Sequence, residues 1–366
     1  MAEPENQTCG EPVSSKLKTA VLGLNEAGKE LLETAAGIDY FQVQAVADKD
    51  TETVEKIAKQ YNCTGYDDYR QFVSANQFDC LLVAAPIHTC NEYLRTAIKK
   101  KFNILKTAPP ARNFEEAVEF VRLAEGEKIK FAVANPARFA QSFLALRQFM
   151  QENQAEQPFL ITAVCNAGDQ THPAWQTDPK LAGGGVLLHN CYQIVDQIMW
   201  NFTTPQQIYS LNTNQATDRQ QRLYLTEDTA VATMKFTDTL FGSLIANKTV
   251  GPAEELLQVH SKDKILTASF GSFIISDQLG KIIEQQTYRD NSQSRTADCL
   301  KNFALSILLP DKNRLCSSGA ENLKNMAVLE AAYLSARTGM PEEPAKILQM
   351  ANIEPANILQ INKSNI

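Results

Sequence analysis

Three polar side chains follow a run of glycines in GGGVLLHNCYQIVDQ, residues 183–197. His189, Gln193 and Asp196 are spaced four and then three residues apart, so a helix would place all three on one face. Imidazole can accept and donate a proton near neutral pH, which suits acid–base chemistry. The glycines would let the backbone come close to a neighbouring group, such as a ligand. The stretch therefore predicts a helix at a reactive or ligand-binding centre.

A second stretch with chemical meaning is GLNEAG, residues 23–28, between a predicted strand and a predicted helix. Gly23 and Gly28 occupy the first and third positions of the glycine fingerprint that binds dinucleotides. Asn25 stands at the second position, where it tolerates left-handed backbone geometry and can donate a hydrogen bond to phosphate. Free N–H groups at the start of the following helix form an anion site. The predicted pyrophosphate contacts are Gly23, Asn25, Glu26, Ala27 and Gly28.

Asp48, at the end of the second predicted strand, lies twenty residues beyond Gly28. An acidic side chain at this position accepts hydrogen bonds from the adenosine ribose hydroxyls. The alternative is an aspartate that only forms a turn. Because a carboxylate repels a 2′-phosphate, Asp48 favours NAD as the cofactor, while Lys49 beside it leaves NADP open.

Alternating strands and helices position these groups in the first third of the chain. Strands are predicted at 18–24, 41–50, 78–86, 102–109 and 129–135, and helices at 26–36, 51–61, 91–101 and 114–127. Strand–helix repetition with such short connections is typical of a doubly wound parallel sheet with right-handed crossovers. We therefore predict an α/β dinucleotide-binding domain over residues 16–136.

The pattern changes after about residue 136. Apolar β-like segments between 207 and 276 follow one another without intervening helices, which favours a large, open, mostly antiparallel sheet. A predicted helix at 319–339 closes the core. The predicted divisions are a disordered tail (1–15), a substrate and oligomerisation α/β domain (137–340) and a C-terminal extension (341–366).

Composition excludes several classes of protein. The 366 residues carry a formal net charge of -7, which argues against a nucleic-acid or anionic-membrane partner. No apolar stretch approaches the roughly 20 residues that span a bilayer. The eight cysteines contain no CxxC pair and the four histidines no ligand spacing, so we expect reduced thiols, a cytoplasmic protein and no metal.

Several segments together resemble one family. They are the glycine fingerprint, the glycine-led helix, AAPIHTC (84–90), NILKTAP (103–109), NPARF (135–139), EDTA (227–230) and LSARTG (334–339). Their order and spacing resemble the glucose–fructose oxidoreductase, inositol dehydrogenase and MocA group of NAD(P)-dependent oxidoreductases. The resemblance implies an N-terminal Rossmann domain and a C-terminal domain whose open sheet forms a homodimer or homotetramer. It also implies hydride transfer between the nicotinamide and a sugar, a polyol or a related small alcohol or ketone.

Two of the family's motifs are altered near the expected cofactor. The Glu-Lys-Pro run corresponds here to LKT, which retains the lysine as Lys106. In the family this lysine lies beside the nicotinamide and hydrogen-bonds the reacting oxygen. The family's TPNxxH run keeps Pro86, which with Ala85 is expected to contact the cofactor, but has Cys90 in place of the histidine.

The glycine-led helix departs furthest from the family. His189 stands at the position of the catalytic aspartate and Gln193 at that of the catalytic histidine, while Asp196 is retained. Glutamine does not titrate, so it cannot transfer a proton.

Three functions fit these residues. In the first, the protein is an oxidoreductase in which Lys106 is the acid–base, His189 assists it and Gln193 orients the substrate. In the second, the protein binds NAD(H) or a small metabolite and has lost catalysis. In the third, it performs non-redox chemistry with tightly held NAD. The expected substrate contacts are Arg138, Trp175, Gln193 and Asp196.

Overall fold

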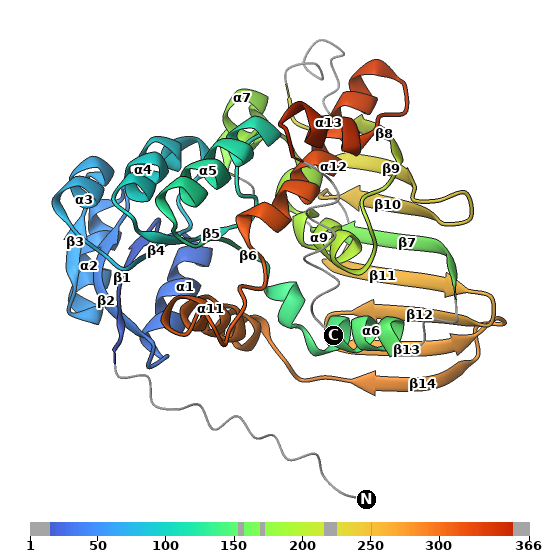
Figure 1. Cartoon of the computed structure of the whole chain (residues 1–366), viewed down its shortest axis with the longest axis horizontal. Helices are drawn as coiled ribbons and strands as arrows, with labels where there is room; N and C mark the ends of the chain where they lie inside the picture. The colour runs from blue at the N-terminus through green and yellow to red at the C-terminus, as the bar shows by residue number, and fades with distance from the viewer. Residues whose placement is uncertain (1–14, 153–156, 169–172, 216–224, 250, 354–366) are drawn as a thin grey trace, which may run out of the picture.

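Two β-sheets lie side by side, one formed by residues 17–134 and one by residues 158–287 (Figure 1). This computed structural model describes residues 15–152, 157–168, 173–215, 225–249 and 251–353. The predicted tail, apart from residue 15, and the end of the predicted C-terminal extension lie outside these ranges. Among the described residues, no helix is long and apolar enough to cross a membrane.

The first sheet is parallel and has six strands in the order β3-β2-β1-β4-β5-β6. Its strands are β1 (Leu17–Leu22), β2 (Phe41–Ala47), β3 (Thr64–Tyr66), β4 (Cys80–Val83), β5 (Asn103–Thr107) and β6 (Phe131–Ala134). The predicted doubly wound sheet is thereby confirmed. The strand order reverses between β1 and β4, which is where such sheets bind ligands.

Helices cover both faces of this sheet. They include α1 (Glu26–Ala36), α2 (Thr51–Tyr61), α3 (Tyr69–Ala75), α4 (Ile87–Lys99) and α5 (Phe114–Glu127). The sequence did not predict β3 or α3, because β3 has only three residues and none of them is buried.

The second sheet has eight strands in the order β14-β13-β12-β11-β7-β10-β9-β8. They are β7 (Pro158–Asn166), β8 (Gln207–Thr213), β9 (Thr229–Lys235), β10 (Phe241–Asn247), β11 (Glu254–Ser261), β12 (Lys264–Ser269), β13 (Ser272–Asp277) and β14 (Ile282–Thr287). Only the β7–β10 pairing is parallel, so the predicted mostly antiparallel sheet is confirmed. One face packs against α6 (Gln141–Glu152), α9 (Tyr192–Asn201) and α12 (Gly319–Thr338), and no described helix covers the other, which we call the open face.

A helix from the second half of the chain completes the first sheet. In Figure 1, α11 (Ser292–Leu308) lies against α1, and it also packs on β6. Its buried residues Leu300 and Phe303 join Leu31 of α1 and Val21 of β1 in one apolar cluster. No helix was predicted from the sequence over residues 292–308. The chain therefore returns to its N-terminal sheet after forming the second one.

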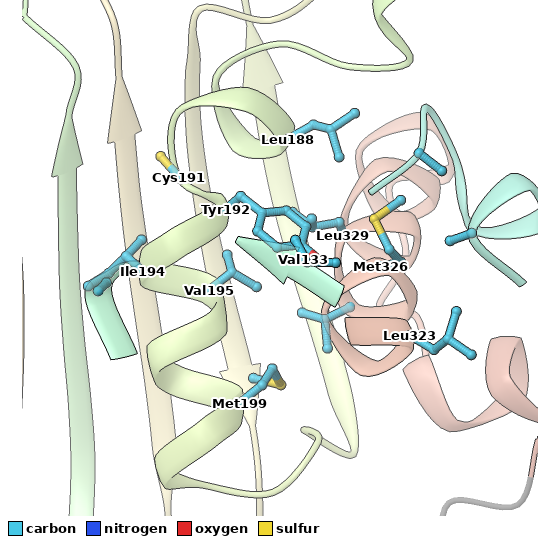
Figure 2. Packing of buried hydrophobic residues seen from close by; sticks show 14 of the residues in the cluster. Val133, Leu188, Cys191, Tyr192, Ile194, Val195, Met199, Leu323, Met326 and Leu329 are labelled. Atoms are coloured by element: carbon cyan, nitrogen blue, oxygen red, sulfur yellow. The ribbon is translucent and has the colours of Figure 1, made fainter. Parts of the chain in front are cut away.

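The single helix predicted after the glycines is two helices, α8 (Val186–His189) and α9, which are separated at Asn190 and Cys191. His189 therefore does not share a helix face with Gln193 and Asp196, as the spacing predicted. The second helix, α9, is buried on more than one side. Figure 2 shows Tyr192 extending from α9 toward α12, where Met326 and Leu329 lie beside it. Its hydroxyl donates a hydrogen bond to Oδ1 of Asn322, at 2.9 Å. Burial raises the pKa of Tyr192 well above its ordinary value. Packing against α12 therefore fixes the start of α9, next to the predicted centre.

Candidate functional site

The two glycines of the fingerprint are required by packing at the β1–α1 turn. Gly23 has a φ of 94°, and a Cβ there would lie 2.2 Å from the backbone nitrogen of Ala85. A Cβ at Gly28 would lie 1.9 Å from the backbone oxygen of Gly23. These separations are too short for any side chain, so the turn must lie directly against the end of β4.

Asn25 caps α1 instead of pointing outward. Its Oδ1 accepts a hydrogen bond from the Gly28 backbone N–H at 2.9 Å, and its Nδ2 donates to the backbone oxygen of Ala84 at 2.8 Å. The expected bond from Asn25 to phosphate would therefore require this cap to open. Glu26 and Ala27 are exposed, and as the first residues of the helix they have no acceptor within it for their N–H groups.

Asp48 is fixed beside this turn. Its Oδ2 accepts from the Leu24 backbone N–H at 2.6 Å, and its Oδ1 accepts from that of Asp50 at 3.1 Å. Each carboxylate oxygen retains capacity for a hydroxyl donor. Lys49 lies with its Nζ 4.7 Å from the centre of the Tyr69 ring. A carboxylate, a helix N-terminus and the β1–β4 switch point together fit the ribose and pyrophosphate of NAD.

A cavity of about 230 Å³ lies where α1 and α11 meet the turn between α8 and α9. It is lined by Ala27, Glu30, Leu31, Thr107, Ala108, Ala134, Pro136, His189, Asn190, Tyr192, Gln193, Ser292, Thr296 and Cys299. We call this cavity the cleft. It brings the predicted residues His189 and Gln193 together with the first turn of the predicted nucleotide-binding helix.

Two separate parts of the chain match family models. Residues 17–135 match the GFO/IDH/MocA oxidoreductase family, NAD-binding Rossmann fold, and residues 143–266 match the GFO/IDH/MocA C-terminal domain. The chain belongs to the GFO/IDH/MocA family. Its first sheet is therefore the family's NAD-binding Rossmann domain, in agreement with the predicted cofactor.

Two curated relatives match parts of the chain. One is the scyllo-inositol 2-dehydrogenase (NADP(+)) IolU of Bacillus subtilis (strain 168), which is 23% identical over 37% of this chain and 42% of that protein. The other is the 2,7-anhydro-N-acetylneuraminate hydratase of Escherichia coli (strain K12), 23% identical over 48% of this chain and 46% of that protein. The chain thus spans less than half the length of the curated relatives it matches.

Solved structures share the fold over almost the whole chain. An oxidoreductase from Agrobacterium radiobacter, in complex with NAD+, L-tartaric acid and magnesium, has a TM-score of 0.78 and 16% identity. That match covers 91% of this chain and 100% of the other. The WlbA dehydrogenase from Bordetella pertussis, in complex with NADH and UDP-GlcNAcA, has a TM-score of 0.75, 16% identity and coverage of 90% and 99%.

Lys106 does not line the cleft. Its Nζ is buried and donates to the backbone oxygens of Pro109, at 2.7 Å, and Thr107, at 3.3 Å. Burial lowers its pKa, and the neighbouring Cys90 and Glu116 partly oppose this shift. Successive strand residues face opposite sides of a sheet, so Lys106 faces α4 and α5, whereas Thr107 faces the cleft. The structure therefore separates the expected acid–base from His189 and Gln193.

The family motif can be matched differently at this strand. If Pro109 is taken as the proline of Glu-Lys-Pro, then Ala108 occupies the lysine position and Thr107 that of the glutamate. Both Thr107 and Ala108 line the cleft, as residues of that motif should. This register leaves the cleft without the family's lysine.

His189, Trp175 and His88 form one cluster of rings, in which Trp175 meets His189 edge to face. The ring of Trp175 is 5.5 Å from that of His189 and 5.1 Å from that of His88. The Nε2 atom of His189 lies 3.0 Å from the backbone oxygen of Ala182. A carbonyl only accepts, so Nε2 carries a proton in this contact. Burial lowers the pKa of His88, and the charge of Arg112 adds to this effect.

Gln193 is held by the backbone that follows β6. Its Oε1 accepts from the Ala137 backbone N–H at 3.0 Å. This contact fixes the orientation of the amide and makes Nε2 its donor group. Gln193 can therefore offer hydrogen bonds in the cleft but cannot transfer a proton.

Arg138 and Asp196 bind each other instead of a substrate. Nε and Nη2 of Arg138 lie 2.7 Å from the two carboxylate oxygens of Asp196, and the side chains are 5% and 0% exposed. Glu321 accepts from Nη1 of Arg138 at 2.9 Å, and Asn325 donates to Asp196 at 2.8 Å. Both side chains are buried in contacts with other protein groups and neither lines the cleft, so the expectation that they contact substrate is corrected.

The glycines at 183–185 lie very close to other parts of the chain. A Cβ at Gly184 would lie 2.1 Å from the hydroxyl oxygen of Tyr333, and one at Gly185 would lie 1.8 Å from the backbone oxygen of Glu227. The Glu227 carboxylate also accepts from the backbone N–H groups of Gly185, at 2.8 Å, and Leu187, at 3.0 Å. These contacts anchor the turn that presents His189.

Sequence reasoning missed the part of the cleft that α11 supplies. Ser292 and Thr296 of α11 line the cleft, and both donate to the carboxylate of Glu30. Asn190 was also missed, although it directly follows His189. The polar positions of α11 fall within a helix that the sequence analysis did not recognise.

Proposed function

We propose that this protein is an NAD-dependent oxidoreductase acting on a CH–OH group of a sugar, polyol or related small alcohol or ketone. The observation that carries the proposal is the meeting of the first turn of α1 with His189 and Gln193 in one cleft. NAD supplies the hydride-accepting ring when it is bound. NADP is the second candidate, because Lys49 follows Asp48.

The proposed roles follow from the positions of the side chains. Asp48 binds the ribose hydroxyls, and the N–H groups of Glu26 and Ala27 hold the pyrophosphate. Gln193 donates from Nε2 to the substrate oxygen. His189, which lines the cleft beside Gln193, is the proposed acceptor of the hydroxyl proton. Trp175 holds the His189 ring through its edge-on contact.

Cofactor binding is the first test of this proposal. Titration calorimetry of the full chain should show NAD binding more tightly than NADP, and Asp48→Ala should weaken it. Absence of binding by either nucleotide at millimolar concentration would reject the proposal. A screen of polyols, sugars and their keto forms should then show a change in NADH absorbance, with a pH dependence that disappears in His189→Gln.

A catalytically silent protein that binds NAD(H) or a metabolite is the second candidate. The observation that favours it is the burial of Lys106 away from the cleft, together with a residue that does not titrate at 193. Binding of NAD without turnover of any substrate in the screen would support this candidate over the first.

We further propose that the open face of the second sheet forms a homodimer or homotetramer. Leu211, Val231 and Ile245 form a cross-strand apolar row on this face, with exposures of 60%, 42% and 49%. Such a row is typical of a buried interface. Sedimentation should show an oligomer that Val231→Lys dissociates, and a wild-type monomer would reject this proposal.

The proposed location is the cytoplasm. All seven cysteines within the described ranges are free thiols, which fits a reducing compartment.

A further inference from the structure

A second cavity of about 420 Å³ adjoins the cleft and shares Asn190 with it. Its walls come from the ends of β7 and β12, the start of β11 and the turn between α8 (Val186–His189) and α9. Its lining residues are Cys165, Asn166, Ala167, Asn190, Ala253, Glu254, Glu255, Ser269 and Phe270. A volume of this size suits a small molecule. We call it the Glu255 cavity.

Glu255 occupies a position on the sheet where its neighbours are apolar. It alternates with Leu257 and Val259 on the face of β11 that turns toward the helices, and it pairs with Cys165 of β7. Its Oε2 atom is buried and has no hydrogen-bond partner. Burial of an unpartnered carboxylate oxygen is costly, so the position is unfavourable for folding alone.

The nearest cation is already bound by other groups. Nη1 of Arg295 lies 3.1 Å from Oδ2 of Asp290, and its guanidinium lies 4.3 Å from the centre of the Phe270 ring. Burial raises the pKa of Glu255 to about 7, and the positive charge of Arg295 opposes this shift only partly. Within the part of the chain that the structure describes, the Glu255 carboxylate therefore has no salt-bridge partner.

The polar walls select the class of ligand. The Glu255 carboxylate disfavours anionic ligands such as sugar acids and phosphates. Asn190, which lines both this cavity and the cleft, can hydrogen-bond hydroxyl groups. An ammonium group brings a positive charge and three N–H donors, and it therefore complements a desolvated carboxylate.

We propose that the Glu255 cavity binds the amino group of an amino polyol or amino sugar, with Glu255 as its ion-pair partner. The remaining hydroxyls of this ligand extend past Asn190 into the cleft. This inference rests on the proposed function for the reaction in the cleft, but the binding that it predicts requires neither turnover nor nucleotide.

The test compares two probes that differ in one group. Calorimetric titration of the full chain at about pH 8 uses 1-amino-1-deoxysorbitol, which carries an ammonium group, and sorbitol, which carries a hydroxyl there. We expect the amino polyol to bind at least about tenfold more tightly, the ratio that corresponds to 1.4 kcal/mol. Glu255→Gln should abolish this preference and leave sorbitol binding unchanged.

The controls separate a folding defect from a binding defect. Glu284→Gln alters an exposed glutamate on β14 and should retain the preference of the wild type. Unchanged NAD affinity in Glu255→Gln would show that this variant is folded. Equal affinities for the two probes, no binding of either probe, or a preference that survives Glu255→Gln would each overturn the inference. Failure of the wild type to bind NAD would reject the proposed function instead.

Discussion

Replacing Glu255 with glutamine should stabilise the protein above neutral pH and have little effect in acid. Burial raises the pKa of Glu255 from 4.5 to about 7, so the folded state holds its proton over a range where the unfolded state has lost it. The wild type therefore loses stability as the pH rises from about 4.5 to about 7. Each pKa unit corresponds to about 1.4 kcal/mol, which gives about 3 kcal/mol across this window. Glutamine resembles the protonated acid and incurs no such loss.

The assay is urea unfolding of the ligand-free wild type and of Glu255→Gln at about pH 5 and about pH 8. We expect similar free energies of unfolding at the lower pH, and a variant more stable by about 3 kcal/mol at the higher pH. Glu284→Gln, which alters an exposed side chain, should match the wild type at both pH values. A difference independent of pH, or a Glu255→Gln variant less stable at the higher pH, would refute the reasoning.

Three further variants test the placement of other groups. Asp196→Ala leaves Arg138 buried without its bidentate partner, so the free energy of unfolding measured in urea should fall by about 3–5 kcal/mol. If the variant instead has normal stability and weakened substrate binding, Asp196 is a substrate contact after all. Gly185→Ala would place a Cβ 1.8 Å from the backbone oxygen of Glu227, so the melting temperature should fall sharply, and an unchanged value would contradict the close approach. Lys106→Met should leave turnover of any substrate found close to that of the wild type, whereas a loss of orders of magnitude would return Lys106 to the mechanism.

The elements that could be predicted are those with a strong periodic signal. Buried strands such as β1 and β4 are short apolar runs, and the helices between them are amphipathic, so the parallel sheet followed directly from the sequence. All six residues of β14 are exposed, and no apolar alternation could mark it as a strand. Its place in the sheet depends on its pairing with β13, which is a contact that the local sequence pattern does not show.

The site was harder to predict because it depends on which way each side chain points as well as on where its residue lies in the chain. Lys106 lies one residue before the cleft-lining Thr107, and that single step along a strand turns its side chain to the other face. Arg138 and Asp196 are 58 residues apart in sequence, so the ion pair between them could not be foreseen. Glu255 did leave a signal, because it is a charged residue in register with Leu257 and Val259.

The position of α11 limits how the cleft can open. Near its start, Ser292 and Thr296 line the cleft, while Leu300 and Phe303, farther along the same helix, are buried against the Rossmann sheet. A rigid helix held in this way moves with the nucleotide-binding half of the molecule. On the other side of the cleft, Gln193 is tied to the Ala137 backbone that follows β6. Both walls of the cleft are therefore connected to the Rossmann sheet, so neither can move away from it without breaking these contacts.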